Sequence, residues 1–421
     1  MKQELAPQDV SIVRTLAEKV AKIAEKPVHT DTAERWQRLN DLEPVRPLVR
    51  IYQIPWREMN VDDELTLQAE SDTARAIEWD LRVTLYRWKH FPVDMVVEPI
   101  YETGYAIRST GQGIRTNMDQ IPYDKQGGVS AKHYHCQIAD EDDIDKIKMP
   151  EVSCDWEATE ETFERTSDLL GDTLPVRKQG RVAHNYAPWD RLAEWCNPGQ
   201  VLIDLITRPE FVHKLMDRLT RSYLRELDQL EEQKLLSAGT GNFGVGQGGL
   251  GYTNQLPQGE RNDREIRLNE QWGGAMAQIF SEVSPKMHEE FALQYEKKIL
   301  KRFGLAYYGC CEPLHRKVDI ISKHIPNLRK ISMSPWVDVR EGAEAIDGRF
   351  VFSFKPNPAF LATDDRWDRK SAEAELRRML EATGGKHVEI ILKDISTVRF
   401  EPQRLWQWAD MAMELLEKHP N

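Results

Sequence analysis

Leu305-Ala-Tyr-Tyr-Gly309 is a short apolar run followed at once by Cys310-Cys-Glu312, and similar runs recur along the chain. The candidate strands are Leu48–Ile54, Asp94–Glu98, Gly180–His184, Leu236–Phe243, Leu305–Gly309, Leu328–Met333, Phe350–Phe354 and His387–Leu392. Between them lie segments of helical length, at about 62–88, 188–235 in pieces, 282–303, 312–324, 338–346, 370–383 and 402–418. Strands that alternate with helices pair in parallel through right-handed crossovers, and about eight such strands close a barrel. The sequence therefore predicts an α/β fold of the (β/α)8 TIM-barrel class, with an open doubly wound sheet as the alternative.

Two parts of the chain lie outside this alternation. Residues 8–42 predict two helices separated by Pro27, with Thr30 or Asp31 as the N-cap of the second. We expect residues 1–45 to form an N-terminal helical extension on a single catalytic barrel domain, residues 46–421. Residues 104–175 carry several glycines and an acidic run, and they predict an insertion after the second strand, at the mouth of the barrel.

The composition is that of an ordinary globular protein, with 40% hydrophobic and 30% charged residues. A net charge of −12 disfavours binding to nucleic acid, because an acidic surface repels phosphates. The sequence shows neither a signal peptide nor the roughly 18 uncharged apolar residues that a membrane span needs. Five cysteines without a secreted pattern favour reduced thiols. We expect a cytoplasmic enzyme for a small-molecule substrate, able to form a homodimer, with neither nucleic acid nor membrane as partner.

Polar side chains follow the carboxyl ends of several predicted strands, where barrel enzymes place their reacting groups. In chain order they are Glu98, Glu102, His184, Asn185, Asn242, Tyr308, Cys310, Cys311, Glu312, Ser332, Ser334, Trp336, Asp338, Lys355, Asn357, Lys393 and Asp394. Catalytic roles are predicted for Lys355, Lys393, Asp394, Glu98 and His184. Substrate-binding roles are predicted for Tyr308, Asn242, Trp336, Asn357 and Arg57.

The sequence Cys310-Cys311-Glu312 is the strongest candidate for a metal site. Thiolates and a carboxylate are suitable ligands for zinc, which could activate a substrate thiol, an alcohol or water. The alternatives are that one or both thiols are small core residues and that Glu312 opens the following helix, with Pro313 in its first turn.

Two other motifs are less specific. The glycine-rich run 239–251 contains no Gly-Lys-Ser/Thr, so a flexible active-site loop is favoured over a phosphate loop. His133-Tyr-His135-Cys136 has the appearance of a metal cluster, but no complementary pair lies nearby in sequence, and a surface or lid role is favoured.

Four elements of the second half occur in a fixed order. They are Thr207-Arg-Pro-Glu-Phe-Val-His-Lys-Leu-Met216, Gln271-Trp-Gly-Gly274, Ser284-Pro-Lys-Met-His-Glu-Glu-Phe-Ala-Leu-Gln-Tyr295 and Tyr308-Gly-Cys310-Cys311. In order and spacing, over about residues 200–420, they resemble the uroporphyrinogen decarboxylase-like superfamily, which also holds cobalamin-linked methyltransferases. The last element stands where the methyltransferases of that superfamily carry "H-x-C-G" at a strand end.

Two motifs distinguish the decarboxylases of the superfamily from its methyltransferases, and both can be compared with this chain. True uroporphyrinogen decarboxylases carry an "R-Q-A-G-R" stretch that grips substrate carboxylates, and this chain has Tyr52-Gln-Ile-Pro-Trp-Arg57 instead. The methyltransferases hold zinc with the His, the Cys two residues later and a second Cys near the last strand. This chain keeps Cys310, has Tyr308 in place of the His, and has Lys393-Asp394 near the last strand, so Cys311, Glu312 or a further residue would have to complete a zinc site.

The resemblance implies a metal-dependent methyltransferase that works with cobalamin on a separate corrinoid protein, with Cys310, Cys311 and Glu312 as metal ligands. One alternative is a metal-independent decarboxylase or lyase acting on a small carboxylic acid, in which the lysines and Arg57 bind the carboxylate. Another is a non-catalytic binding protein on the same fold, because fold alone does not fix function.

Overall fold

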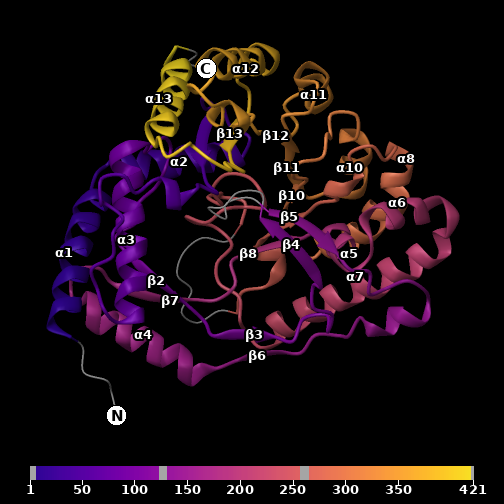
Figure 1. Ribbon diagram of the computed structural model, residues 1–421, viewed down its shortest axis with the longest axis horizontal. Helices are drawn as coiled ribbons and strands as arrows, with labels where there is room; N and C mark the ends of the chain where they lie inside the picture. Colours follow the sequence, from indigo (N-terminus) through magenta and orange to yellow (C-terminus); the bar gives the residue numbers. More distant parts are fainter. Residues whose placement is uncertain (1–5, 123–129, 257–264, 419–421) are drawn as a thin grey trace.

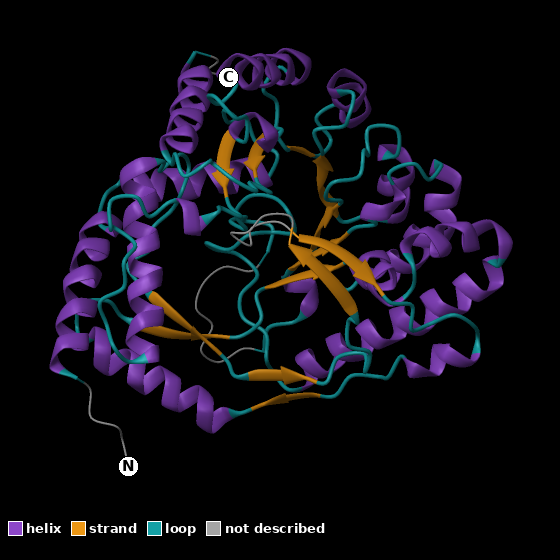
Figure 2. Ribbon diagram, in the orientation of Figure 1, coloured by secondary structure: helices purple, strands orange, loops and turns teal. Residues whose placement is uncertain are grey.

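A computed structural model describes residues 6–122, 130–256 and 265–418 of the chain. Within these ranges the main sheet has seven strands, all parallel, in the order β1-β13-β12-β11-β10-β9-β8. Their bounds are β1 Leu48–Ile51, β8 Ala183–Tyr186, β9 Trp272–Ala275, β10 Leu305–Tyr308, β11 Leu328–Met333, β12 Val351–Phe354 and β13 Val388–Leu392. The sheet curls inside a ring of helices, as Figures 1 and 2 show.

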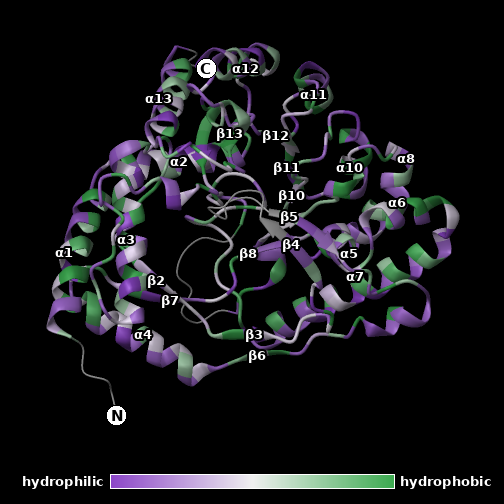
Figure 3. Cartoon of the chain, in the orientation of Figure 1, coloured by the Kyte–Doolittle hydropathy of each residue, from purple (hydrophilic) through white to green (hydrophobic). Residues whose placement is uncertain are grey.

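The ring is made of α-helices from all parts of the described chain. Their bounds are α1 Pro7–Ala24, α2 Val28–Asn40, α3 Asp72–His90, α4 Trp156–Leu170, α5 Pro188–Trp195, α6 Pro198–Thr207, α7 Pro209–Glu232, α8 Pro285–His288, α9 Gln294–Leu300, α10 Val318–His324, α11 Val339–Ile346, α12 Arg369–Thr383 and α13 Gln403–Glu417. Most are hydrophobic on one side and hydrophilic on the other (Figure 3), so each buries one face against its neighbours. None of the described helices is long and apolar enough to span a membrane.

Strands β9 to β13, which we call the closed wall, are each paired on both sides. Four of the sequence-predicted strands lie here and agree with the structure to within one residue at each end. The face toward the helices is apolar, with Ile331, Phe352 and Ile390 in the main hydrophobic core. The opposite, concave face carries polar side chains, and Lys330 and Glu389 form an ion pair there at 2.8 Å between Nζ and Oε2. A buried charge requires such a partner, because an unpaired one loses its hydration without compensation.

The predicted closed, eight-stranded barrel is wrong for the described residues, because the second predicted strand does not form. Asp94–Glu98 is a loop, and β1 and β8 are the two ends of an open sheet. The fourth predicted strand, Leu236–Phe243, is also wrong. Only Leu236 makes an isolated bridge, to Arg181, and β9 takes the place between β8 and β10. The third predicted strand, Gly180–His184, is found later in the sequence, as β8 Ala183–Tyr186. The first predicted strand begins at Leu48 as expected but ends at Ile51.

The free edge of β1 is covered by Asp94 and Arg87. Asp94 N donates to Val49 O at 3.4 Å, and Val49 N donates to Asp94 Oδ2 at 2.8 Å. Arg87 Nη2, from α3, donates to Ile51 O at 3.1 Å. We call this edge, with residues 93–102 and the loop 239–251, the open side. Backbone groups of an edge strand need partners when water is excluded, and here a carboxylate and a guanidinium provide them in place of a strand.

The first two helices form as predicted around Pro27, but neither predicted cap is used. Helix α2 begins at Val28, with Pro27 itself at the N-cap, so Thr30 and Asp31 lie inside the first turn. Trp36 of α2 is fully buried and donates from Nε1 to Asp94 O at 2.8 Å. The N-terminal helices are therefore tied to the open side.

The described parts of residues 104–175 contain short paired strands, a 3-10 helix at Asp142–Lys146 and the α-helix α4. The strands of this part and its neighbours are β2 Tyr101–Gly104, β3 Ile107–Ser109, β4 Met118–Pro122, β5 Ser130–Tyr134, β6 Val152–Cys154 and β7 Val176–Gln179, paired as β2-β7, β3-β6 and β4-β5. In Figure 1 the β4–β5 hairpin projects toward the middle of the view. His133 and His135 lie on or beside β5, and His135 Nε2 lies 3.0 Å from Asp119 Oδ2 at the surface.

Candidate functional site

The end of β10 turns sharply to present Cys310. Gly309 has a φ of +96°, and a Cβ at this position would overlap Leu314 Cδ1. Only glycine satisfies both conditions without strain. Ser332 Oγ, from β11, donates to Cys310 O at 2.5 Å and holds the turn against the sheet. The thiol is thus fixed at the carboxyl end of the closed wall.

The Cys310 thiol lies between a second thiol and an ammonium group. Its Sγ is 3.4 Å from Cys311 Sγ, and Lys393 Nζ donates to it at 3.3 Å. The hydrogen bond with Cys311, helped by the charges of Lys393 and Lys355, lowers the pKa of Cys310, although burial and Glu312 oppose this. The same thiol–thiol contact, with burial, raises the pKa of Cys311. Cys310 is therefore the thiol of the pair that loses its proton more readily.

Lys393 and Asp394 reach this site from the end of β13. Burial acts to lower the pKa of Lys393, but the negative charge of Cys310 and its neighbours raises it above the ordinary value. Asp394 lies 3.1 Å from Lys393 Nζ through Oδ2, and Cys311 Sγ lies 3.7 Å from the same oxygen. Asp394 has a φ of +56°, an uncommon conformation that its N–H stabilises by donating to Gln53 Oε1 at 3.2 Å.

Glu312 is buried beneath the turn, with both carboxylate oxygens bound to backbone amides. Cys310 N donates to Oε2 at 2.9 Å, and Ala277 N donates to Oε1 at 3.1 Å. Across the described ranges, no group of three or more His, Cys, Asp or Glu side chains is placed to hold a metal ion. The carboxylate beside the thiols, Asp394, is paired with Lys393, which brings a positive charge where a cation would bind. The arrangement does not make up the ligand set of a zinc site, and ligation by Cys310, Cys311 and Glu312 stays a prediction.

Lys355 lies deeper on the concave face than Lys393. Its Nζ donates to Tyr307 OH at 2.7 Å, and Tyr307 OH is 3.1 Å from Ser353 Oγ. Burial lowers the pKa of Lys355 to about 8, although the charge of Cys310 acts in the opposite direction. A lysine with this pKa can exchange a proton near neutral pH, and its position below Cys310 makes it a candidate proton donor.

The glycine-rich run is packed along the concave face. Side chains at Gly246 and Gly248 would overlap the ring of Tyr307, and one at Gly249 would overlap Trp36. The glycines therefore serve close packing of a loop against strands and α2. Gln247, in the same loop, accepts a hydrogen bond from Tyr52 OH at 3.0 Å, so the loop also borders the site from the side of β1.

Two predicted site residues face the helices instead of the concave face. Tyr308 OH donates to Glu296 Oε2 at 2.6 Å and lies 2.7 Å from His288 Nε2, all buried. His184 Nε2 lies 3.0 Å from Gln271 Oε1, and burial lowers the pKa of His184 to about 4. Alternate residues of a strand point to opposite faces, so Tyr307, the residue before Tyr308, faces the concave side.

The other predicted residues are spread over the carboxyl-end loops. Asn357 Oδ1 accepts from Ala359 N at 3.0 Å and caps a short 3-10 helix, and Trp336 is 70% exposed. Arg57 pairs with Glu58 at 3.4 Å. Glu98 accepts a hydrogen bond from Tyr252 OH, and Asn242 donates to Val96 O, both on the open side. Of the predicted site residues, Cys310, Cys311, Lys355, Lys393 and Asp394 come together, with Glu312 directly beneath.

Sequence reasoning missed the polar residues inside strands. Arg50, Tyr307, Ser353 and Glu389 all lie on the concave face, where they contact one another or the glycine-rich loop. Their signal was present, because a charged or hydroxyl residue within an apolar strand needs a partner on a sheltered face.

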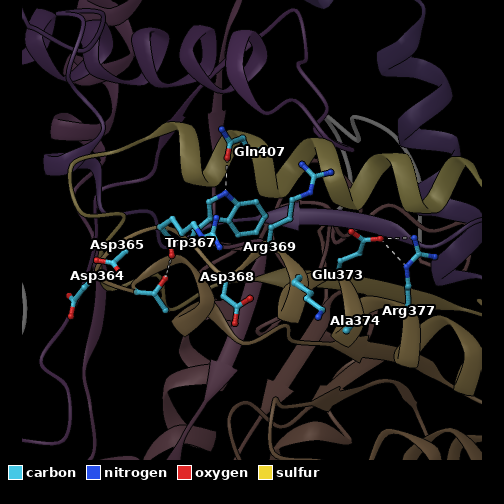
Figure 4. Close-up of a pocket in the computed structure, with 12 residues that line it drawn as sticks. Asp364, Asp365, Trp367, Asp368, Arg369, Glu373, Ala374, Arg377 and Gln407 are labelled. Carbon is cyan, nitrogen blue, oxygen red and sulfur yellow. Dashed lines mark hydrogen bonds and ion pairs between the residues drawn. The ribbon is translucent and has the colours of Figure 1, made fainter.

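A separate hollow lies outside the sheet, among the loop 363–368 and the helices α12 and α13 (Figure 4). Trp367 Nε1 donates to Gln407 Oε1 at 2.6 Å across it, and Glu373 pairs with Arg377 at 2.6 Å on its rim. No predicted site residue lines it. The Glu373–Arg377 pair is partly exposed to solvent, where such pairs contribute little.

Comparisons with solved structures give distant likenesses, of which one is described below. No protein-family model matches the chain, and no curated protein matches it. A solved structure described as a methyltransferase from Methanosarcina mazei aligns with 12% sequence identity and a TM-score of 0.49, over 92% of this chain and 98% of that chain. At this identity and score the likeness carries no activity over to this chain. Membership of the uroporphyrinogen decarboxylase-like superfamily stays a prediction.

Proposed function

We propose that this chain is a methyltransferase in which the Cys310 thiolate acts on the transferred methyl group. The observation that carries the proposal is the contact of 3.3 Å between Lys393 Nζ and Cys310 Sγ, at the strand end where the resembling methyltransferases place a cysteine. A thiolate is a strong nucleophile toward saturated carbon, and a fixed ammonium keeps it deprotonated.

In the proposed step, Cys310 Sγ attacks the methyl carbon of a bound donor. The S–CH3 bond forms while the bond between carbon and donor breaks, and the donor keeps the electron pair. We take the donor to be methylcobalamin held by a corrinoid protein, whose cobalt leaves in its reduced, electron-rich form. An acceptor nucleophile then removes the methyl group from sulfur and restores the thiolate. Lys393 stabilises the thiolate before and after transfer, and Lys355 can supply or take the acceptor's proton.

The test uses methylcobalamin as donor and follows both partners. The cobalamin spectrum reports loss of the methyl group, and peptide mass spectrometry reports a methyl group on Cys310. We expect C310A to lose methylation and K393M to slow it, while C136A, which removes an exposed cysteine far along the chain, reacts like wild type. Wild-type protein that never demethylates methylcobalamin, with or without added zinc, would contradict the proposal.

Metal content is measured on the same samples. Near-stoichiometric zinc that is lost in C310A would make Cys310 a metal ligand and, if the Cys310 peptide is never methylated, would contradict its role as the methyl carrier. A methylated Cys310 peptide without bound zinc would support that role.

A metal-independent decarboxylase or lyase is the second candidate. The pair of buried lysines beside the site favours it, since two ammonium groups could bind and polarise a small carboxylic acid. It predicts that C310A and C311A keep most activity, whereas K355A does not.

A further inference from the structure

The open side contains a cavity that the Cys310 site does not use. Its volume is about 350 Å³, and it lies between α3, the free edge of β1, residues 93–102 and the glycine-rich loop. It exists because the second strand does not form, so space that a closed barrel would fill with backbone remains open. Arg50 of β1 and Arg87 of α3 both line it.

Neither arginine is neutralised by a carboxylate in contact with it within the described ranges. Arg50 Nη1 donates to Gly248 O at 2.5 Å, and its guanidinium lies 4.6 Å from the ring centre of Tyr52. Arg87 donates only to Ile51 O, and its Nε is buried without a hydrogen-bond partner among the described residues. Burial, with the like charge of Arg50, lowers the pKa of Arg87 to about 10.

The acidic residues of the same cavity are already engaged. Asp94 is bound by Arg46 at 2.6 Å, and Glu98 accepts from Tyr252 OH at 2.8 Å. Asp80 accepts from Tyr101 OH at 2.8 Å, and Glu102 pairs with Arg177. Their hydrogen-bond partners thus lie on other side chains, and Arg87 Nε is a buried donor of this cavity without a partner among the described residues.

Two guanidinium groups that share a sheltered cavity are costly unless an anion joins them. Arginine presents planar forks of donors that match the oxygens of a carboxylate or phosphate group. We propose that this cavity binds a small oxyanion, the carboxylate or phosphate group of a metabolite, between Arg50 and Arg87. The site is separate from Cys310, and the proposal is independent of methyl transfer.

The experiment is a calorimetric titration of the full-length protein with inorganic phosphate and, separately, with acetate, at constant ionic strength. A charge-assisted hydrogen bond contributes about 1.5–3 kcal/mol, so R87Q and R50Q should each weaken binding by roughly 10-fold to 100-fold. R221Q is the matched control, because it removes an exposed guanidinium on α7. The stronger of the two anions identifies the class of ligand.

Circular dichroism establishes that each variant is folded. If R87Q does not fold, R87K keeps the charge while losing the fork, and it should still weaken binding. Wild-type protein that binds neither anion would overturn the proposal without any variant. So would equal losses in R87Q and R221Q, or a loss of anion binding in K393M that R87Q does not share, since this would place the anion at the Cys310 site.

Discussion

In both the closed wall and the open side, the backbone groups of the strands need hydrogen-bond partners, but the two regions provide these partners differently. In the closed wall, each strand from β9 to β13 has a strand on both sides, so the ladder provides partners for the backbone. On the open side, β1 has β13 on one side only, and the Asp94 carboxylate, the Asp94 amide and the Arg87 guanidinium provide partners on the other. A strand can be replaced by side chains, and the replacement leaves a charged cavity where backbone would have been.

The same difference separates residues that stabilise the fold from residues that could take part in a reaction. The thiol and ammonium groups of the proposed site lie at the strand ends of the closed wall, where Cys310, Lys393 and Lys355 converge. Polar groups of the open side are mostly committed to holding the fold. Substitutions on the open side should therefore act first on stability, and those at the closed wall's strand ends on reactivity.

The largest effect is expected for D94A. Asp94 is 2% exposed, accepts from Val49 N and pairs with Arg46, so its loss leaves an amide and a guanidinium without their partner. We expect the free energy of unfolding to fall by about 3–5 kcal/mol, measured by urea denaturation. D364A, which breaks the exposed pair with Arg399, is the control and should change it by less than about 1 kcal/mol. Equal effects would remove the distinction between the two regions.

A smaller loss is expected for G249A in the glycine-rich loop. The added methyl group would overlap the buried ring of Trp36, which is held by Asp94 O. Overpacking of this kind costs about 1–3 kcal/mol, visible as a lower midpoint in the same denaturation. G104A, where a Cβ meets nothing within 4 Å, should be close to neutral. A wild-type midpoint in G249A would show that the loop does not pack on α2.

Glu296 of α9, which accepts a hydrogen bond from Tyr308 of the closed wall, should make stability depend on pH. Burial raises the pKa of Glu296 to about 8, so the folded state favours the protonated acid. Its contribution is complete below the unfolded pKa and is lost as pH rises through about 8. E296Q, neutral at every pH, should flatten this decline, measured as thermal midpoints between about pH 5 and about pH 8. The surface variant E373Q should keep the wild-type slope, and an unchanged slope in E296Q would contradict the assignment.

The smallest effect in free energy is expected for K393M. Removing the ammonium that contacts Cys310 Sγ should move the pH profile of Cys310 alkylation by iodoacetamide to higher pH by about one unit. Mass spectrometry of the Cys310 peptide measures the rate, and Cys196, whose pKa burial raises to about 12, is an unreactive thiol in the same sample. A profile that does not move would show that Cys311 alone lowers the pKa of Cys310.

The sequence predicted the closed wall well because each strand there is an apolar run bounded by helices. Leu328–Met333 is correct at both ends. The sequence pattern also indicated that Cys310, Lys393 and Asp394 lie together, because the carboxyl ends of parallel strands meet at one edge of the sheet. The open side could not be predicted in this way. Asp94–Glu98 has a short, strand-like pattern, but instead of forming a strand it bonds the edge of β1 through the carboxylate and the amide of Asp94. Nor could the pattern show that Trp272–Ala275, with two glycines, forms β9, since glycine is unusual within strands.

The pairing of β1 with β13 has a consequence for how the chain acquires its structure. Leu48 pairs with Glu389, so the first strand of the main sheet finds its ladder partner only in the last strand of that sheet. Such a contact closes a very long loop of chain, which slows folding and leaves early segments exposed meanwhile. On the ribosome, β1 must wait until β13 has been synthesised. A chain that stops before β13 would release β1 with no neighbouring strand, and it would be a natural substrate for chaperones.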